Sequence, residues 1–244
     1  MSRQIIRVTG EDREAFLQGL VTNDVRRAPC WAALLTPQGK YLADFLIVPT
    51  GDALLIDVDA RLADDLLRRL SMYKLRSKVD LAPVEMLIAR GTGVPPADSI
   101  ADPRHPALGW RLYGQSGDDG SDWDAIRVAN LIPETLAELI PNETYILEVG
   151  FERLHGVDFR KGCYVGQEVT ARMKHKSELR KGLTRLAIAG AAAPGTPITH
   201  EGREVGTLGT QSGAHALAHV RFDRVAPGMT AGEARLDPAE PLPA

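Results

Sequence analysis

The residues with the clearest capacity for chemistry lie between positions 160 and 176, which read RKGCYVGQEVTARMKHK. Cys163 is one of two cysteines in the chain, and its neighbours include the cations Lys161 and Lys174. If a helix begins near Gly166, the thiol also precedes the positive end of the helix dipole. Nearby cations and a helix N-terminus both favour the thiolate, which is the nucleophilic form of cysteine. The stretch therefore predicts a reactive or recognition thiol.

Two glycines set this cysteine apart from an ordinary core position. A lone cysteine is commonly a buried, inert thiol, and this alternative stays open. However, Gly162 and Gly166 flank the pair Cys163–Tyr164. Glycine is the default residue where the backbone takes unusual dihedral angles or comes close to a ligand. The pattern favours a shaped loop beside a ligand over simple core packing.

The two cysteines and the first residues bear on location. Cys30 and Cys163 are too few and too far apart for a disulfide framework, although a single bridge between them is an alternative. The start, MSRQIIRVTGEDREAF, lacks the apolar core of a signal peptide and becomes acidic too early for a transit peptide. No apolar run reaches the roughly 18 residues that suggest a membrane span. We therefore predict a cytoplasmic protein with no membrane partner.

Familiar cofactor motifs are absent from the sequence. It contains no H-E-x-x-H, no C-x-x-C, no P-loop and no glycine-rich dinucleotide motif. His215 and His219 would share one face of a strand, but no third ligand lies near them in sequence. The acidic run from Asp118 to Asp124 lacks the glutamate that closes a calcium loop. The sequence therefore predicts no metal held by this chain alone.

The charge balance argues against nucleic acid as a partner. The chain has 244 residues, is 44% hydrophobic and 25% charged, and carries a net charge of −3, so no global field attracts RNA. A local basic run contains Lys174, Lys176, Arg180 and Lys181. Such a run is usually a solvated face, and direct RNA binding is not expected.

Alternating strands and helices precede the cysteine segment. Amphipathic spacing predicts helices over residues 11–21 and 60–71. Apolar runs bounded by turn residues predict strands over 4–8, 31–36, 41–48, 53–58 and 77–89. This order predicts an α+β fold in which an antiparallel or mixed sheet carries helices on one face.

The second half of the chain changes character near Lys181. Helical spacing covers residues 121–140, where Pro133 and Pro141 should divide it into one helix and a shorter, irregular one. From Lys181 onward, short strands with glycine turns predict a small barrel or sandwich of about 60 residues. We therefore predict two domains, 1–180 and 181–244, and a loose tail from residue 237.

The octapeptide KGCYVGQE, at residues 161–168, resembles the signature of the YgfZ family of folate-binding proteins that assist iron–sulfur cluster assembly. That family is related to the glycine cleavage T-protein, an aminomethyltransferase. The segments GLVTNDV, LLTPQGKYLADFLIV, YKLRSKV and GVDFRKGCY are similar in the same order, and EGREVGTLGTQSG resembles the terminal barrel of the T-protein. The resemblance implies a T-protein-like α+β body that binds tetrahydrofolate near its middle, with a C-terminal β-barrel.

The resemblance also implies a set of site residues. A pterin presents a ring edge of donors and acceptors, which a carboxylate and an amide can satisfy in pairs. By position, the residues that would face this pocket are Asn23, Asp24, Asp44, Lys161, Gly162, Tyr164, Gly166, Gln167 and Glu168. The carboxylates of the folate tail would meet Arg127, Arg172 or Lys174.

Two functions of different classes follow from the resemblance. In the first, the protein binds tetrahydrofolate and assists assembly or repair of [4Fe–4S] clusters in client enzymes, including radical enzymes that modify tRNA, with Cys163 as the working thiol. In the second, it is a one-carbon transferase that uses Asp44. T-proteins carry two acidic residues where this chain has Asp44 and Phe45, and they lack a cysteine at the position of Cys163. These departures favour the first function.

Overall fold

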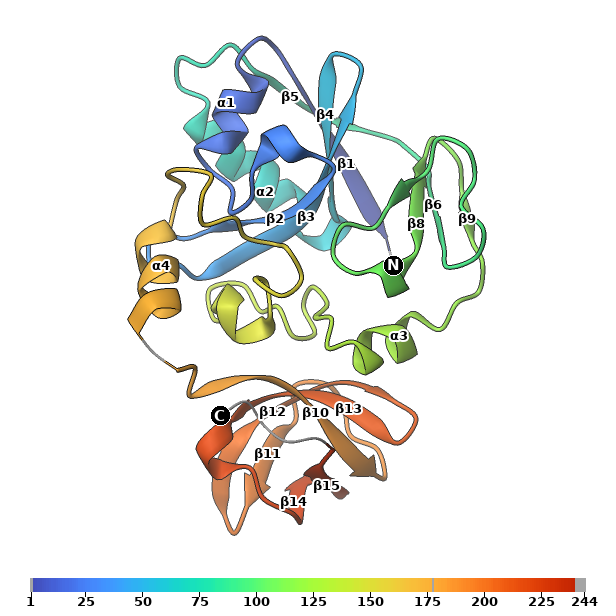
Figure 1. The fold of residues 1–244 in the computed structure, drawn as a ribbon, viewed down its shortest axis with the longest axis vertical. Coiled ribbons are helices and arrows are strands. Elements are labelled where there is room, and N and C mark those ends of the chain that lie inside the picture. The colour runs from blue at the N-terminus through green and yellow to red at the C-terminus, as the bar shows by residue number, and fades with distance from the viewer. Residues whose placement is uncertain (1, 177, 240–244) are drawn as a thin grey trace. The chain divides into compact units, whose positions relative to one another are not determined.

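The computed structural model describes residues 2–176 and 178–239, and its ribbon is shown in Figure 1. The chain forms two compact units. One consists of Met1–Ser121 and Glu152–Ala171, and the other of Asp122–Phe151 and Arg172–Ala244. The first unit therefore contains Cys163, and the second contains the C-terminal strands.

The first unit is built on a five-stranded antiparallel sheet. Its strands are β1 (Arg3–Thr9), β2 (Cys30–Leu35), β3 (Tyr41–Thr50), β4 (Ala53–Asp59) and β5 (Asp80–Val84), in the order β2-β3-β4-β1-β5. Helices α1 (Arg13–Gln18) and α2 (Ala60–Tyr73) pack on one face, where Phe16, Leu17, Leu66 and Leu70 join the sheet residues of the core. The predicted α+β arrangement is confirmed.

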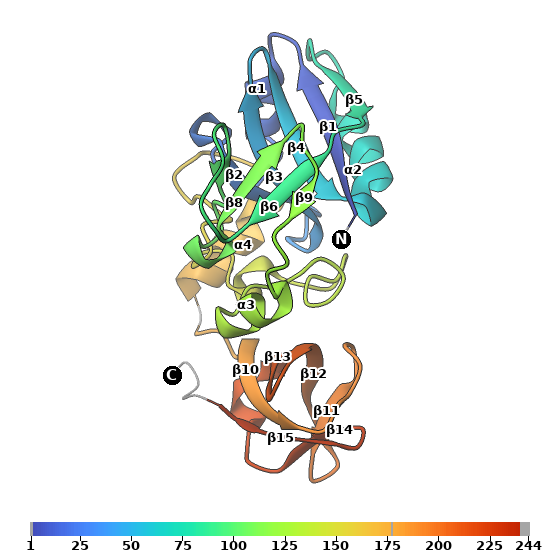
Figure 2. The same cartoon turned by 90° about the vertical axis from the view of Figure 1, so that its right-hand side faces the viewer.

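The opposite face of this sheet is also covered, so its central strands are buried on both sides. Trp31, Asp44 and Asp57 point to this face because side chains alternate along a strand, and their neighbours Ala32, Phe45 and Ile56 belong to the core. Figure 2 shows strands of a second, mixed sheet in front of the first. This sheet has the order β7-β8-β6-β9. Its strands are β6 (Ile88–Gly91), β7 (Ile100–Ala101), β8 (Trp110–Tyr113) and β9 (Gly117–Asp118).

Asp57 joins the two sheets through ion pairs. Its carboxylate is fully buried and receives Arg3 Nε at 2.6 Å, Arg111 Nη1 at 3.1 Å and the hydroxyl of Tyr113 at 3.0 Å. Burial alone would raise the pKa of this carboxyl group. The two guanidinium charges outweigh burial, and the pKa lies below its ordinary value.

The second unit contains a closed six-stranded barrel, as predicted. Its strands are β10 (Lys181–Ala189), β11 (Pro197–His200), β12 (Arg203–Ser212), β13 (His215–Arg221), β14 (Met229–Ala231) and β15 (Ala234–Pro238). They close in the order β10-β13-β12-β11-β14-β15 around buried residues such as Leu186, Ile198 and Leu236. The predicted tail begins inside β15, and its last five residues lie outside the part described.

Two of the predicted helices are shorter in the structure. α1 was predicted over residues 11–21 and ends at Gln18, and α3 covers only Trp123–Ala129 of the predicted range 121–140. Residues 131–149 form turns, a bridge and a short 3-10 helix at Ile146–Val149, in keeping with the expected interruption by Pro133. α4 (Gln167–Lys176) begins one residue after the predicted start.

The division into domains at residue 180 remains a prediction. The barrel strands do begin at Lys181, but the compact unit around them also takes in Asp122–Phe151. No helix among the described residues is long and apolar enough to cross a membrane.

Candidate functional site

Cys163 lies in an exposed loop of the first unit, between Lys161 and the start of α4. Its thiol is free, and Cys30 is also free, so the alternative of a bridge between them does not occur. Cys30 is buried at the start of β2, and burial, with a contribution from Asp24, raises the pKa of its thiol to about 12. Of the two thiols, Cys163 is therefore the one open to chemistry, and the buried alternative weighed for it does not hold.

Two glycines shape this loop for different reasons. Gly162 has a φ of +97° and Gly166 a φ of +82°, a region that side chains rarely adopt. A Cβ on Gly166 would also lie 2.5 Å from the carbonyl oxygen of Thr36, whereas nothing lies within 4 Å of a Cβ on Gly162. Gly166 thus permits close contact between the start of α4 and the β2–β3 turn. Gly162 is required only for its positive φ angle, because a side chain there would meet no neighbour.

Lys161 fastens the loop to the first helix. Its ammonium group donates to the backbone oxygens of Gln18 and Val21, and it lies 5.0 Å from the centroid of the Tyr164 ring. In return, Gln18 Nε2 donates to the Lys161 carbonyl oxygen at 3.2 Å. Burial lowers the pKa of Lys161 to about 8, although Asp24 and other nearby acidic groups partly offset it. Lys161 therefore positions the thiol loop.

The predicted ligands Asn23 and Asp24 belong to a short segment, Thr22–Asp24, that is hydrogen-bonded to residues 155 and 156, just before the thiol loop. We call this segment the Thr22–Asp24 clasp. Asn23 Nδ2 donates to the carbonyl oxygens of Trp31 at 2.7 Å and His155 at 2.6 Å. Its Oδ1 accepts the Asp24 N–H at 2.9 Å, so both ends of the amide are used within the fold. The neighbouring Thr22, fully buried, donates to the Gly156 carbonyl oxygen at 2.7 Å.

Asp24 supports the clasp from the side of α1. Its Oδ1 accepts hydrogen bonds from Gln18 Nε2 at 3.0 Å and from the Arg26 N–H at 3.1 Å. Gln18 Oε1 also accepts the N–H of Val25 at 2.9 Å. The sequence reading missed Gln18, although a polar residue beside the apolar stripe of a predicted helix is a signal that it needs a buried partner.

Asp44 is a buried carboxylate held by two aromatic side chains. Trp31 Nε1 donates to Oδ2 at 2.9 Å, and the Tyr41 hydroxyl donates to Oδ1 at 2.8 Å. The residue is 5% exposed. The two donors, one on each carboxylate oxygen, fix the orientation of this group. A buried, oriented carboxylate is a group that can recognise a donor-bearing ligand.

Arg127 does not have the open donors that a folate tail would need. Its guanidinium is 7% exposed and contacts Asp124, Thr210, Glu138, Glu134 and the carbonyl oxygen of Ile132, at 2.7 to 3.6 Å. Its two terminal nitrogens make four hydrogen bonds, and Nε lies 3.6 Å from a carboxylate oxygen of Glu134. Arg127 is therefore held by partners within the second unit, and these contacts count against its expected role at a folate tail.

The remaining predicted residues lie on or just before α4. Tyr164 is buried, and burial raises the pKa of its hydroxyl. The side-chain oxygen of Gln167 accepts the Tyr164 N–H at 3.2 Å, while Glu168 is exposed. Arg172 and Lys174 are exposed and belong to the second unit; the side chain of Lys176 lies outside what the structure describes.

The fold defined by these elements is that of the glycine cleavage T-protein. The aminomethyltransferase T of the glycine cleavage system from Bartonella henselae aligns with 96% of this chain and 81% of its own, with a TM-score of 0.73 and 11% identity. Residues 180–243 match the family described as the C-terminal beta-barrel domain of CAF17. The T-protein-like fold with a terminal barrel, expected from the resemblance, is confirmed.

Sequence similarity points to iron–sulfur cluster assembly factors. The chain is 31% identical to the iron-sulfur cluster assembly factor IBA57 homolog, mitochondrial, of Mycosarcoma maydis over 97% of its length. It is 29% identical to the mouse factor IBA57, mitochondrial, over 91%. The chain spans 66% of the length of the Mycosarcoma relative and 56% of that of the Neurospora crassa relative.

These names also correct the predicted location. Each of these relatives is named as a mitochondrial protein, whereas we predicted a cytoplasmic one. The prediction rested in part on cysteine use, which does not distinguish two reducing compartments. The cytoplasmic assignment is therefore wrong by this comparison.

Proposed function

We propose that this protein is a tetrahydrofolate-binding accessory factor that assists assembly or repair of [4Fe–4S] clusters in client enzymes, radical enzymes that modify tRNA among them. The observation that carries the proposal is the exposed thiol of Cys163 on a loop fixed by Lys161 and the Thr22–Asp24 clasp. The names of the relatives, which are iron–sulfur cluster assembly factors, support the same role.

The proposed contribution of Cys163 is a thiolate contact to iron or sulfur during assembly. A [4Fe–4S] cluster takes four cysteinyl ligands, and this chain has one exposed thiol. Cys30 is buried with a pKa near 12, so it does not supply a second ligand. The remaining ligands must come from a partner, which is either a client enzyme or another assembly factor.

The proposed folate site centres on Asp44. A carboxylate suits the N–H donors of a pterin edge, and Trp31 and Tyr41 fix the orientation of this one. Asn23 and Arg127 do not fit as ligands because their donors are used within the fold. A bound tetrahydrofolate would supply one-carbon or reducing chemistry.

Reconstitution of a client enzyme tests the thiol role. Apo-client, iron and sulfide are incubated with wild-type protein, Cys163→Ala or Cys30→Ala, and the recovered client activity is measured. We expect Cys163→Ala to lose the stimulation and Cys30→Ala, the matched control, to retain it. Full stimulation by Cys163→Ala would reject the role.

Titration with tetrahydrofolate tests the ligand independently. We expect Asp44→Asn to weaken binding and Cys163→Ser to leave it unchanged. Removing a charged hydrogen-bond partner costs about 1.5–3 kcal/mol, or at least about tenfold in affinity. Wild-type protein that fails to bind tetrahydrofolate would remove the folate part and leave the thiol part standing.

A folate-dependent one-carbon transferase is the second candidate, and the observation that favours it is the buried Asp44 in a T-protein fold. Asp44 would act as a general base or electrostatic partner near the reacting nitrogen of the folate. Assays with tetrahydrofolate and aminomethyl or formaldehyde donors distinguish the two. Turnover that depends on Asp44 and ignores Cys163 favours the transferase.

A further inference from the structure

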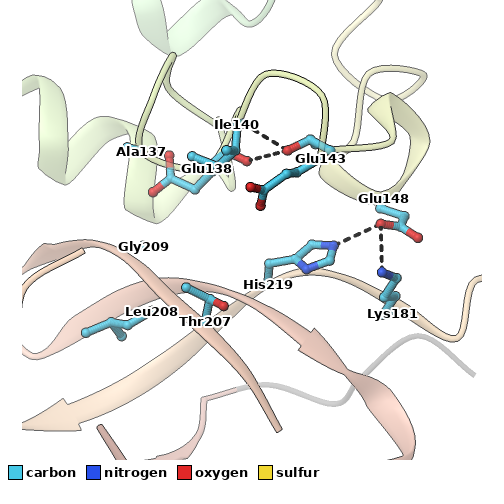
Figure 3. Close-up of a pocket in the computed structure, with 11 residues that line it drawn as sticks. Ala137, Glu138, Ile140, Glu143, Glu148, Lys181, Thr207, Leu208, Gly209 and His219 are labelled. Carbon is cyan, nitrogen blue, oxygen red and sulfur yellow. Dashed lines mark hydrogen bonds and ion pairs between the residues drawn. The ribbon is translucent and has the colours of Figure 1, made fainter. Parts of the chain in front are cut away.

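The second unit has a cavity of about 210 Å³ against strands β12 and β13 of the barrel, and Figure 3 shows the residues that line it. The Glu138 carboxylate at this cavity lies 3.4 Å from Arg127. The Glu148 carboxylate lies 3.1 Å from His219 Nε2 and 3.8 Å from Lys181 Nζ. These carboxylates are therefore used within the fold of the second unit.

In the first unit, by contrast, a series of ion pairs leads from the second sheet toward the proposed ligand group. Arg111 of β8 contacts Asp57 through Nη1 and Asp102 through Nε, each at 3.1 Å. Asp102 accepts hydrogen bonds from Arg104 Nε at 2.9 Å and Nη2 at 2.7 Å, and it also accepts the Arg104 N–H at 3.1 Å. Two parallel bonds of this kind fix the plane of a guanidinium group. Arg104 is therefore held in one orientation.

The pair of Asp102 and Arg104 is shielded from water. Asp102 is 5% exposed and Arg104 is 9% exposed. Burial alone would raise the pKa of the Asp102 carboxyl group, but the guanidinium charges of Arg104 and Arg111 outweigh burial and hold this pKa well below its ordinary value. The Asp102 carboxylate is therefore charged at neutral pH, and it keeps its hold on Arg104.

The guanidinium group of Arg104 lies over the indole ring of Trp31. Its Cζ is 6.0 Å from the ring centroid, a distance at which a cation still attracts the face of an aromatic ring. This attraction is stronger away from water, and Trp31 is only 1% exposed. Trp31 Nε1 in turn donates to Asp44 Oδ2 at 2.9 Å. A tilt of the ring would move this donor, so the position of Arg104 bears on Asp44.

We propose that Arg104 is a positioning residue, which orients the Trp31 ring and, through the indole N–H, the Asp44 carboxylate. This inference rests on the proposed folate function, in which Asp44 recognises the pterin edge. Arg104 acts through Trp31 and is not itself a ligand residue. Arginine suits this task because its planar group can hold a carboxylate with its edge and stack on a ring with its face, whereas lysine offers a single point charge.

Two measurements on the same variants test the proposal. NMR reports the indole N–H signal of Trp31, assigned with Trp31→Phe, and titration with tetrahydrofolate reports the affinity. We expect Arg104→Gln to shift the Trp31 signal and to weaken the affinity about five- to thirtyfold. Arg104→Lys keeps the charge but loses the two parallel bonds, so it should lie between wild type and Arg104→Gln in both measurements.

Arg61→Gln is the matched control. Arg61 forms the same pair of bonds with Asp59, from Nε at 2.9 Å and from Nη2 at 2.7 Å, but its side chain is 57% exposed. We expect this variant to leave both the Trp31 signal and the affinity for tetrahydrofolate unchanged. The comparison separates the loss of an arginine–aspartate pair in general from the loss of the guanidinium group over Trp31.

An unchanged Trp31 signal in Arg104→Gln would overturn the proposal, and so would a shifted signal with unchanged affinity. Thermal unfolding checks that each variant is folded, and Arg104→Lys carries the same test should Arg104→Gln not fold. Wild-type protein that fails to bind tetrahydrofolate would reject the folate function. The Trp31 signal alone would then decide whether Arg104 orients the ring.

Discussion

Cys163 and Cys30 differ in access to solvent, and burial also suppresses the ionisation of Cys30. Cys163 is exposed in a loop, whereas Cys30 is buried in β2 with a pKa raised to about 12. Reactivity follows the thiolate fraction and the access of the reagent. The contrast makes Cys30 an internal reference for Cys163, because both can be measured in one sample.

Alkylation should therefore separate the two thiols. With iodoacetamide at pH 8 and native conditions, we expect peptide mapping to find Cys163 labelled and Cys30 protected. At that pH the thiolate fraction of Cys30 is on the order of one in ten thousand, from its pKa of about 12. In urea both should react. Native labelling of Cys30 at the rate of Cys163 would contradict this assignment.

Contacts between neighbouring strands could be predicted from the sequence, whereas contacts between distant segments could not. Trp31 and Asp44 belong to adjacent strands of one hairpin, and alternation along two predicted strands puts them on the same face. By contrast, the bond from Asn23 to His155 joins residues far apart in the chain. No local pattern reports such a contact, so the sequence did not show that both ends of the Asn23 amide are used within the fold.

At the scale of elements, the start of α4 is fixed by its contact with the β2–β3 turn. Gly166 lies against the Thr36 carbonyl oxygen, and Gly39 faces Val169. The loop that carries Cys163 ends at this contact, so its shape depends on it. The helix start predicted near Gly166 lies one residue from the observed start at Gln167, because a glycine commonly marks the boundary of a helix.

Two matched alanine variants test this contact. Gly162→Ala places a side chain in a left-handed conformation and open space, and should cost about 1–2 kcal/mol in unfolding free energy. Gly166→Ala adds a clash with the Thr36 carbonyl oxygen and should cost more, by roughly 1 kcal/mol or above. Urea unfolding measures both. Equal costs would mean that the contact with the turn does not constrain the loop.

The ion pairs of Asp57 connect β1 and β4 to β8 in a second test at this scale. Removing the carboxylate charge with Asp57→Asn breaks the ion pairs to Arg3 and Arg111, at a cost of about 3 kcal/mol at pH 7 because Arg111 keeps its pair with Asp102. The folded pKa is lower than the unfolded value of about 3.9. The stabilisation is therefore present above pH 4 and lost as pH falls through the folded pKa.

Unfolding of wild type and Asp57→Asn across pH measures this effect directly. The difference between the two proteins should be largest at neutral pH and should shrink below about pH 4. A difference that grows on acidification would show that Asp57 is not the paired carboxylate described here.

At the scale of the molecule, each compact unit has its own buried polar centre. In the second unit this centre is Arg127, which joins α3 to Glu138 and to Thr210 of β12. Arg127→Met should leave Glu138 unpaired and destabilise this unit by about 3–5 kcal/mol. Hydrogen exchange should show lost protection in β12 with protection in β1 to β4 retained. Protection lost equally in both would contradict two separate units.

The whole fold was more accessible to sequence reasoning than the site. Alternating buried residues in β10 and the glycine turns predict a barrel by local rules, and the closed barrel is present. The second sheet escaped prediction because its strands are only two to four residues long. The cavity at His219 escaped as well, since its walls come from segments about 60 to 80 residues apart in the chain.

The proposed function depends most on Cys163 as the working thiol, and a complementation assay in cells measures whether that thiol is needed. Cells lacking the protein receive wild type, Cys163→Ala or Cys30→Ala at matched abundance, and the activity of a [4Fe–4S] client enzyme is measured. We predict that Cys30→Ala restores the activity and Cys163→Ala does not. Full restoration by Cys163→Ala would contradict the account.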